Sequence, residues 1–128
     1  MDRRVLLRNA LGIGLAGAAA AACRQVPLHQ ELTGEFPGRG SSAMRADQIR
    51  RAGAAQGWVI TDRLPGVLRG TLNRRDQQAV VDIPYDARRF SIRYARSSNL
   101  NYDGANINSN YNTYVQRLHR AIAAQPAT

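Results

Sequence analysis

The chain of 128 residues has little of the chemistry on which disulfide, metal and catalytic sites depend: one cysteine, no lysine and two histidines. One cysteine excludes an intrachain disulfide, so an apolar core must hold the folded part together. His29 and His119 lie far apart in the sequence and form no spaced set of zinc ligands or converging catalytic groups. We therefore expect no metal, no cofactor and no enzymatic activity.

Long apolar runs are also missing. The longest, Ala10 to Ala22, has 13 residues, fewer than the roughly 20 that span a bilayer. Arg3, Arg4 and Arg8 precede it and Cys23 follows it directly. A basic start, an apolar stretch and a small-residue end are typical of a secretory signal. Because a cysteine follows the alanines, the segment resembles a bacterial lipoprotein signal, which implies removal of residues 1–22 and lipidation of Cys23.

The signal leaves the export route open, because the Arg3-Arg4 pair also resembles a reduced twin-arginine signal. Arg24 stands where an aspartate favours retention in the inner membrane, so we expect an anchor in the outer membrane, facing the periplasm. The chain after residue 22 keeps 15 arginines against 8 acidic residues. Such a charge can attract nucleic acid, but a protein exported to the cell envelope meets mainly anionic lipid and cell-wall polymer. We expect no nucleic-acid partner.

Turn-forming residues dominate residues 23–42, among them Pro27, Gly34, Pro37 and Gly38. They predict a flexible tether. The remaining residues, 43–124, are long enough for a single domain.

Periodicity predicts a helix at residues 43–56 and four alternating strands at 58–63, 67–72, 78–84 and 89–96. The residues expected to face inward are Trp58, Ile60, Asp62, Leu68, Gly70, Leu72, Ala79, Val81, Ile83, Phe90, Ile92 and Tyr94. A second helix follows Asn108, its expected N-cap, with an apolar stripe of Ile107, Tyr111, Val115, Leu118 and Ile122. The predicted fold class is α+β: a helix, a four-stranded antiparallel meander and a helix, with both helices packed on one sheet face.

Several short motifs occur in a familiar order: Gly57-Trp58, Tyr94, Asn99-Leu100 and Tyr111-Asn112. Together with the signal, they resemble a group of small proteobacterial lipoproteins of unknown function. The resemblance implies an envelope location and offers no reaction, cofactor or catalytic residue.

Two sets of residues are candidates for binding. The amide-rich and phenolic set can hydrogen-bond an envelope protein or a cell-wall polymer, and comprises Asn99, Asn101, Tyr102, Asn110 and Tyr111. The alternative is that this loop only joins strand to helix. The basic set, for an anionic surface, comprises Arg63, Arg69 and Arg93. Its alternative is that these arginines only solvate the outer sheet face.

An enzymatic alternative would use Asp82, Asp86 or Asp103 as acid or base on a glycan or peptide. It requires two of these carboxyl groups within about 5–10 Å of each other. The run from Asn99 to Gly104 also resembles the start of an EF-hand calcium loop, but Asn110 stands where that loop needs a bidentate glutamate. We therefore expect turn formation rather than calcium binding.

Overall fold

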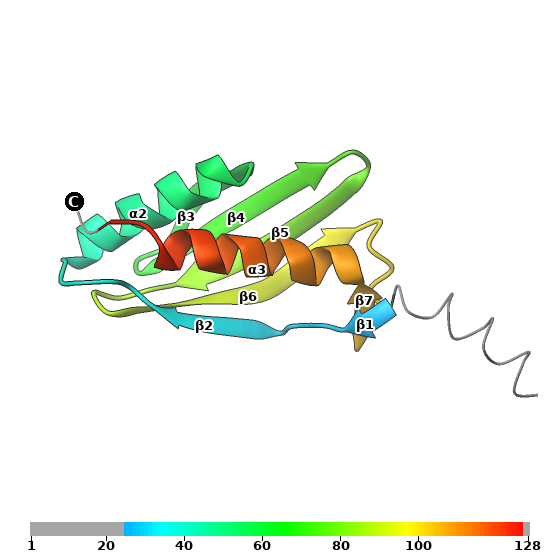
Figure 1. Cartoon of the computed structure of the whole chain (residues 1–128). Coiled ribbons are helices and arrows are strands. Elements are labelled where there is room, and N and C mark those ends of the chain that lie inside the picture. Colours follow the sequence, from blue (N-terminus) through cyan, green and yellow to red (C-terminus); the bar gives the residue numbers. More distant parts are fainter. Residues whose placement is uncertain (1–24, 127–128) are drawn as a thin grey trace, which may run out of the picture.

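The computed structural model describes residues 25–126 and shows two antiparallel sheets and two helices (Figure 1). The larger sheet has five strands in the order β2-β6-β5-β4-β3, and β1 and β7 form a separate two-stranded ribbon. The elements are β1 (Gln25–Pro27), β2 (Glu31–Glu35), α2 (Ser42–Ala55), β3 (Trp58–Leu64), β4 (Val67–Arg74), β5 (Gln77–Pro84), β6 (Arg89–Ser98), β7 (Asn106–Asn108) and α3 (Ser109–Ala123). Within this part of the chain, no helix combines the length and the apolar character needed to span a bilayer.

The predicted fold, a four-stranded meander between two helices, is wrong, because the described chain is mostly β, with seven strands in two sheets. The four expected strands are present as β3 to β6 and pair antiparallel in sequence order. β2 adds a fifth strand beside β6, and β1 pairs with β7. These three strands come from segments rich in turn-forming residues, so periodicity does not predict them.

Residues 25–35, expected to belong to a flexible tether, are a structured part of the domain. β2 pairs residue by residue with β6, and the flanking side chains of Leu28 and Phe36 are buried. Gly34 allows close packing: a Cβ atom there would lie 2.5 Å from Phe90 Cζ and 2.7 Å from His119 Nε2. The folded unit therefore includes Gln25, and the predicted boundary at residue 43 is wrong.

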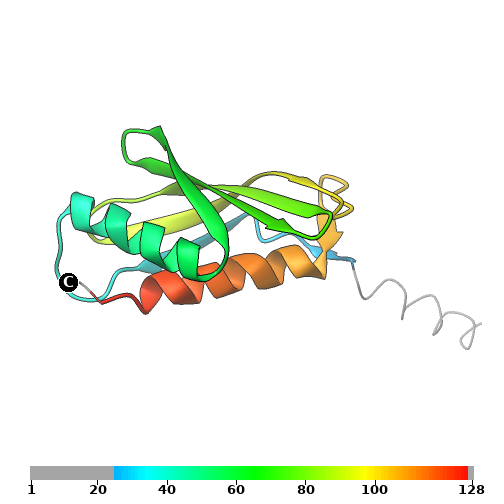
Figure 2. The ribbon, with the colours of Figure 1, turned by 90° about the horizontal axis from the view of Figure 1, so that it is seen from above.

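The core lies between the inner face of the five-stranded sheet and the two helices, which cover that face side by side (Figures 1 and 2). The predicted inward alternation is confirmed by the buried sheet residues Trp58, Leu68, Leu72, Ala79, Val81, Ile83, Phe90 and Ile92. The predicted helix stripe is confirmed by buried Tyr111, Val115, Leu118 and Ile122, while Ile107 is buried within β7 instead. Burial at about 25 cal/mol per Å² of apolar surface is the main force that assembles these layers.

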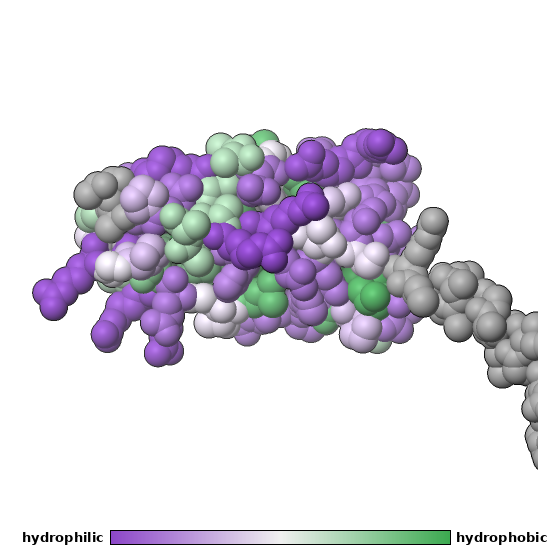
Figure 3. Space-filling view, in the orientation of Figure 1, coloured by the Kyte–Doolittle hydropathy of each residue, from purple (hydrophilic) through white to green (hydrophobic). Residues whose placement is uncertain are grey.

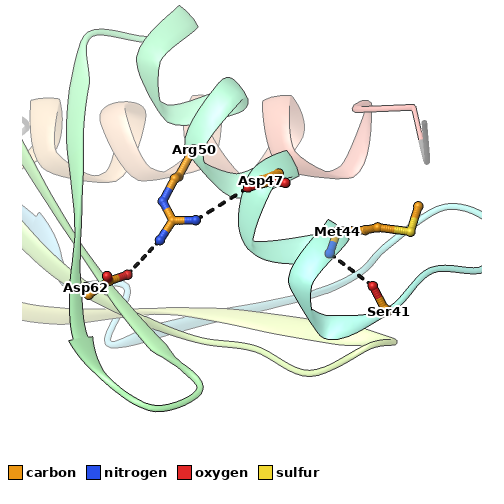
Figure 4. Close-up of polar contacts among 5 residues, drawn as sticks. All are labelled: Ser41, Met44, Asp47, Arg50 and Asp62. Atoms are coloured by element: carbon orange, nitrogen blue, oxygen red, sulfur yellow. Dashed lines mark hydrogen bonds and ion pairs between the residues drawn. The ribbon is translucent and has the colours of Figure 1, made fainter.

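Side-chain hydrogen bonds set the start of both helices. The Ser41 hydroxyl caps α2 by accepting from the Met44 N–H at 3.2 Å (Figure 4). Asn108 caps α3 as predicted, its side chain accepting from the Asn110 N–H at 2.9 Å. Each cap satisfies a backbone donor that has no partner within its helix.

The edge strand β3 is attached to α2 by an ion pair. Arg50 lies 2.6 Å from Asp62 on β3 and 3.5 Å from Asp47 on its own helix (Figure 4). Asp62 occupies an inward position of the alternation, yet its side chain is exposed because the sheet ends there. The pairing of β3 with β4 shifts register between Asp62 and Leu64.

Arg45 is a buried cation that the sequence analysis did not identify. Its side chain is 1% exposed and lies 4.8 Å above the Phe36 ring. The guanidinium donates hydrogen bonds of 2.8 to 3.1 Å to the backbone oxygens of Pro37, Gly38 and Ala87 and to Gln48 Oε1. Burying a cation is costly without such bonds. Its spacing with Ile49 and Ala52, at i, i+4 and i+7, is the sequence signal that places Arg45 on the buried face of α2.

Candidate functional site

Four segments meet at one end of the domain, which we call the N-terminal end: β1, β7, the loop 99–105 and the β4–β5 turn (residues 74–77). Figures 1 and 2 both show them at the end where the described chain begins. Gln25 Nε2 donates to the Asn101 carbonyl at 3.0 Å, and Asn99 Nδ2 donates to the Asp76 carbonyl at 2.7 Å. The loop is therefore bonded both to the first described strand and to the β4–β5 turn.

The amides of the loop have a conformational role. Asn99 and Asn101 have φ of 58° and 54°, a region that asparagine tolerates better than most residues. Between them, Leu100 is buried in the core. Asp103 Oδ1 accepts from the backbone N–H groups of Ala105 and Asn106, and these bonds hold the pKa of Asp103 below its ordinary value. The loop is fixed in shape, as expected of a segment that joins strand to helix.

Of the five predicted binding residues, four are exposed and one is not. Asn99, Asn101, Tyr102 and Asn110 are on the surface at this end. The prediction for Tyr111 is wrong, because its side chain is completely buried in the core. Burial raises the pKa of the Tyr111 phenol, and Tyr94 packs edge-on against it with ring centroids 5.4 Å apart. Tyr102 packs against Tyr94 with tilted rings whose centroids are 4.6 Å apart, so it is an exposed ring in contact with a partly buried one.

A cavity of about 600 Å³ lies beside the loop, between the β4–β5 turn and the first turns of α3. It is lined by Asn73, Arg74, Arg75, Asp76, Gln77, Asn110 and Tyr114. The Tyr114 hydroxyl donates to Gln77 Oε1 at 2.7 Å, which ties the helix to the turn. Its lining is polar and charged, in contrast to the mostly apolar lining of typical small-molecule sites. Asn110 is the one predicted binding residue that lines it.

Two arginines make the cavity basic. Arg74 and Arg75 are exposed, and Arg74 Nη2 donates to the Gln56 carbonyl at 3.1 Å. In the ion pairs found among residues 25–126, neither arginine takes part. Among the described residues, Asp76 is the only carboxylate that lines the cavity. Figure 3 shows hydrophilic residues over this turn, at the upper right.

The arginines predicted to bind an anionic surface lie on the outer face of the sheet, opposite the core. Carboxylates of the protein already contact them. Arg69 donates twice to Asp82, at 2.8 and 3.2 Å, and Arg63 lies 3.6 Å from the same carboxylate. Arg93 donates to Glu31 across the β2–β6 pair at 2.8 Å. These bonds lower the pKa of Glu31 and raise that of Arg69. Three positive charges are thus opposed by two negative ones.

The carboxylates of the enzymatic alternative each have a local partner. Asp82 is bound by Arg69, and Asp86 Oδ1 accepts from the backbone N–H groups of Arg88 and Arg89 within the β5–β6 turn. Those two bonds lower the pKa of Asp86. A general acid needs a raised pKa, so the environments of Asp86 and Asp103 favour turn formation over acid catalysis. Among residues 25–126, no group of three or more histidine, cysteine or acidic side chains is placed to hold a metal ion.

Sequence reasoning missed the structural role of Asn112, the second residue of the Tyr-Asn motif. Its Nδ2 donates to the Pro27 carbonyl at 2.9 Å, and its Oδ1 accepts from the His29 N–H at 3.1 Å. His29 and His119 add to this connection, through Gln116 and the Thr33 carbonyl respectively. The motif therefore secures the N-terminal segment to α3 and needs no ligand to explain it.

Comparisons with known proteins identify no family, since no family model, no curated protein and no solved structure matches the chain. Cys23 lies outside the described residues. The resemblance to small lipoproteins and the lipidation of Cys23 both stay predictions.

Proposed function

We propose that this chain is a lipid-anchored protein of the bacterial cell envelope that binds a partner and has no catalytic role. The basic start, the short apolar stretch and the alanines before Cys23 support the anchor. Arg24 supports an outer-membrane position facing the periplasm. The partner is another envelope protein or a cell-wall polymer, recognised at the N-terminal end of the domain.

The cavity beside the β4–β5 turn is the observation that carries this proposal. Asn110, Tyr114 and Gln77 present amide and phenol groups there, and such groups exchange hydrogen bonds with sugar hydroxyls and with backbone groups. The exposed ring of Tyr102 adds an apolar contact, 38% exposed, at the same end. Fixed loops that carry polar groups on a rigid sheet are a common arrangement for binding.

The anchor is tested by metabolic labelling. Cells that express the full chain should incorporate labelled palmitate into it, and the Cys23→Ser variant should incorporate none. Undiminished labelling of the variant, or a mature N-terminus other than Cys23, would contradict the anchor.

The binding surface is tested by photo-crosslinking in intact cells. A photoreactive residue at position 110, in the cavity, should give discrete crosslinked species. The control is the same residue at Val59, which is 61% exposed on the outer face of the sheet. If both positions give the same crosslinked products, or position 110 gives none, the N-terminal end is not the binding surface.

A further inference from the structure

The N-terminal end of the domain lies next to the predicted anchor. Gln25 is already part of β1, and it is only two residues from Cys23. A chain extends by at most about 3.6 Å per residue, so these two α-carbons are no more than about 7 Å apart. With the proposed lipid on Cys23, this end therefore faces the headgroups of the bilayer.

Arg74 and Arg75 lie at this same end. The Asn99–Asp76 hydrogen bond joins their turn to the loop that Gln25 contacts through Asn101. Both arginine side chains are exposed beside the cavity, outside the ion pairs among the described residues. In this they differ from Arg69 and Arg93, which form ion pairs with Asp82 and Glu31.

Arginine has the geometry for a phosphate group. Its planar guanidinium presents paired N–H donors that match two oxygens of a phosphate, and it is more weakly hydrated than an ammonium group. Arg75 can therefore engage a phosphate without giving up a hydrogen bond to the described residues, and Arg74 can do so with the N–H groups that its bond to the Gln56 carbonyl leaves. The Asp76 carboxylate reduces the local charge and leaves it positive.

We propose that Arg74 and Arg75 bind the phosphate groups of anionic phospholipids in the membrane that carries the anchor. The proposal rests on the proposed lipidation of Cys23 for the orientation of the domain, and on the arginines and the cavity for the chemistry. For these two arginines, phospholipid headgroups are favoured because a two-residue connection holds the turn close to the membrane, while Asn110 and Tyr114, on the α3 side of the cavity, are left for the envelope partner.

The test uses the mature chain, residues 23–128, with Cys23→Ser so that no lipid anchor contributes to binding. Its affinity is measured by co-sedimentation with vesicles of phosphatidylglycerol and phosphatidylcholine, and with vesicles of phosphatidylcholine alone. The chain should prefer the anionic vesicles. Arg74→Gln with Arg75→Gln should weaken that binding by about 25-fold, from about fivefold for each arginine near an anionic surface.

The matched control replaces Arg88 and Arg89 with glutamine. These are also adjacent arginines in a turn, at the opposite end of the domain, and their backbone contacts to Asp86 do not involve the side chains. The control should bind anionic vesicles as the parent chain does. Thermal unfolding shows whether the double variant is folded. If the Arg74→Gln, Arg75→Gln variant is less stable than the parent chain, the single variant Arg75→Gln replaces it in the test. This variant should bind anionic vesicles about fivefold more weakly than the parent chain.

Several results would overturn the proposal. Equal binding to both kinds of vesicle would exclude anionic lipid as the ligand. Equal losses of affinity in the two double variants would show that binding depends on the net charge of the domain and not on Arg74 and Arg75. Inorganic phosphate that shifts the NMR signals of residues 73–77 while vesicles do not would indicate a site for a soluble anion. Failure of palmitate labelling alone would contradict the anchor, whereas failure of vesicle binding in a labelled protein would contradict only this inference.

Discussion

Asn112 in α3 donates its side-chain amide to the backbone carbonyl of Pro27 at 2.9 Å, across 85 positions of sequence. The same amide group accepts from the His29 N–H. One side chain thus holds the start of the described chain against α3.

We expect Asn112→Ala to lower the free energy of unfolding by about 1–3 kcal/mol, because it leaves a partly buried donor and acceptor without partners. Urea unfolding measures the change, and hydrogen exchange should show the largest loss of protection in residues 25–35. Asn110→Ala, an exposed asparagine of the same helix, is the control and should change stability by less than about 0.5 kcal/mol. Equal effects of the two substitutions would contradict this role.

Gly34→Ala should destabilise the domain by about 1–3 kcal/mol through overpacking. The added Cβ would lie 2.5 Å from Phe90 Cζ, so the ring must move or β2 must separate from β6. Thermal unfolding measures the effect, with Thr33→Ala on the exposed side of the same strand as control. If Gly34→Ala leaves the melting temperature unchanged, there is space for a methyl group at this position, and the close packing of β2 against Phe90 is contradicted.

Arg75→Asn should raise the free energy of unfolding by about 0.5–1 kcal/mol. Arg75 has a φ of 58°, where most side chains are strained and asparagine is tolerated. Arg74→Asn, one position earlier in β4, is the control and should not stabilise, because asparagine is unfavourable in strands. Chemical denaturation compares the two, and a loss of stability in Arg75→Asn would show that the turn depends on the arginine side chain.

Stability should fall in acid because of Asp103. Its folded-state pKa is below its ordinary value of 3.8, owing first to the hydrogen bonds from the Asn106 and Ala105 N–H groups. The unfolded chain then binds the proton more readily, so this stabilisation is present above about pH 4 and is lost as the pH falls through the folded-state pKa. Asp103→Asn cannot titrate and should show a shallower loss of stability in urea unfolding at low pH. Parallel pH profiles for the parent and the variant would contradict this.

The central strands could be predicted from sequence, and the N-terminal strands could not. β3 to β6 alternate apolar and polar residues because one sheet face is buried, and that pattern is local. β2 has only Leu32 and Gly34 facing inward, and its stability comes from pairing with β6 and from contacts to α3, both distant in sequence. From sequence alone, a glycine such as Gly34, which allows close packing against Phe90, cannot be distinguished from a glycine in a flexible segment.

The candidate site was predicted in part, for similar reasons. Asn99 and Asn101 were expected in an exposed loop, and they are exposed. Tyr111 belongs both to the amide-rich segment and to the apolar stripe of α3, and the stripe determines its position because burial of a large ring outweighs exposure of one hydroxyl. The cavity depends on Gln77 and Tyr114 meeting across 37 positions, which no local pattern indicates.

The ion pair of Asp62 with Arg50 and the register shift beside it have a consequence for self-association. Among the described strands, β3 lies at the edge of the sheet, and unpaired edge strands can pair with strands of neighbouring molecules and begin aggregation. A charged residue at an inward position and an irregular ladder both disfavour such addition, since an incoming strand would find a carboxylate where it needs an apolar contact. Molecules crowded together on a surface can therefore remain separate at this edge.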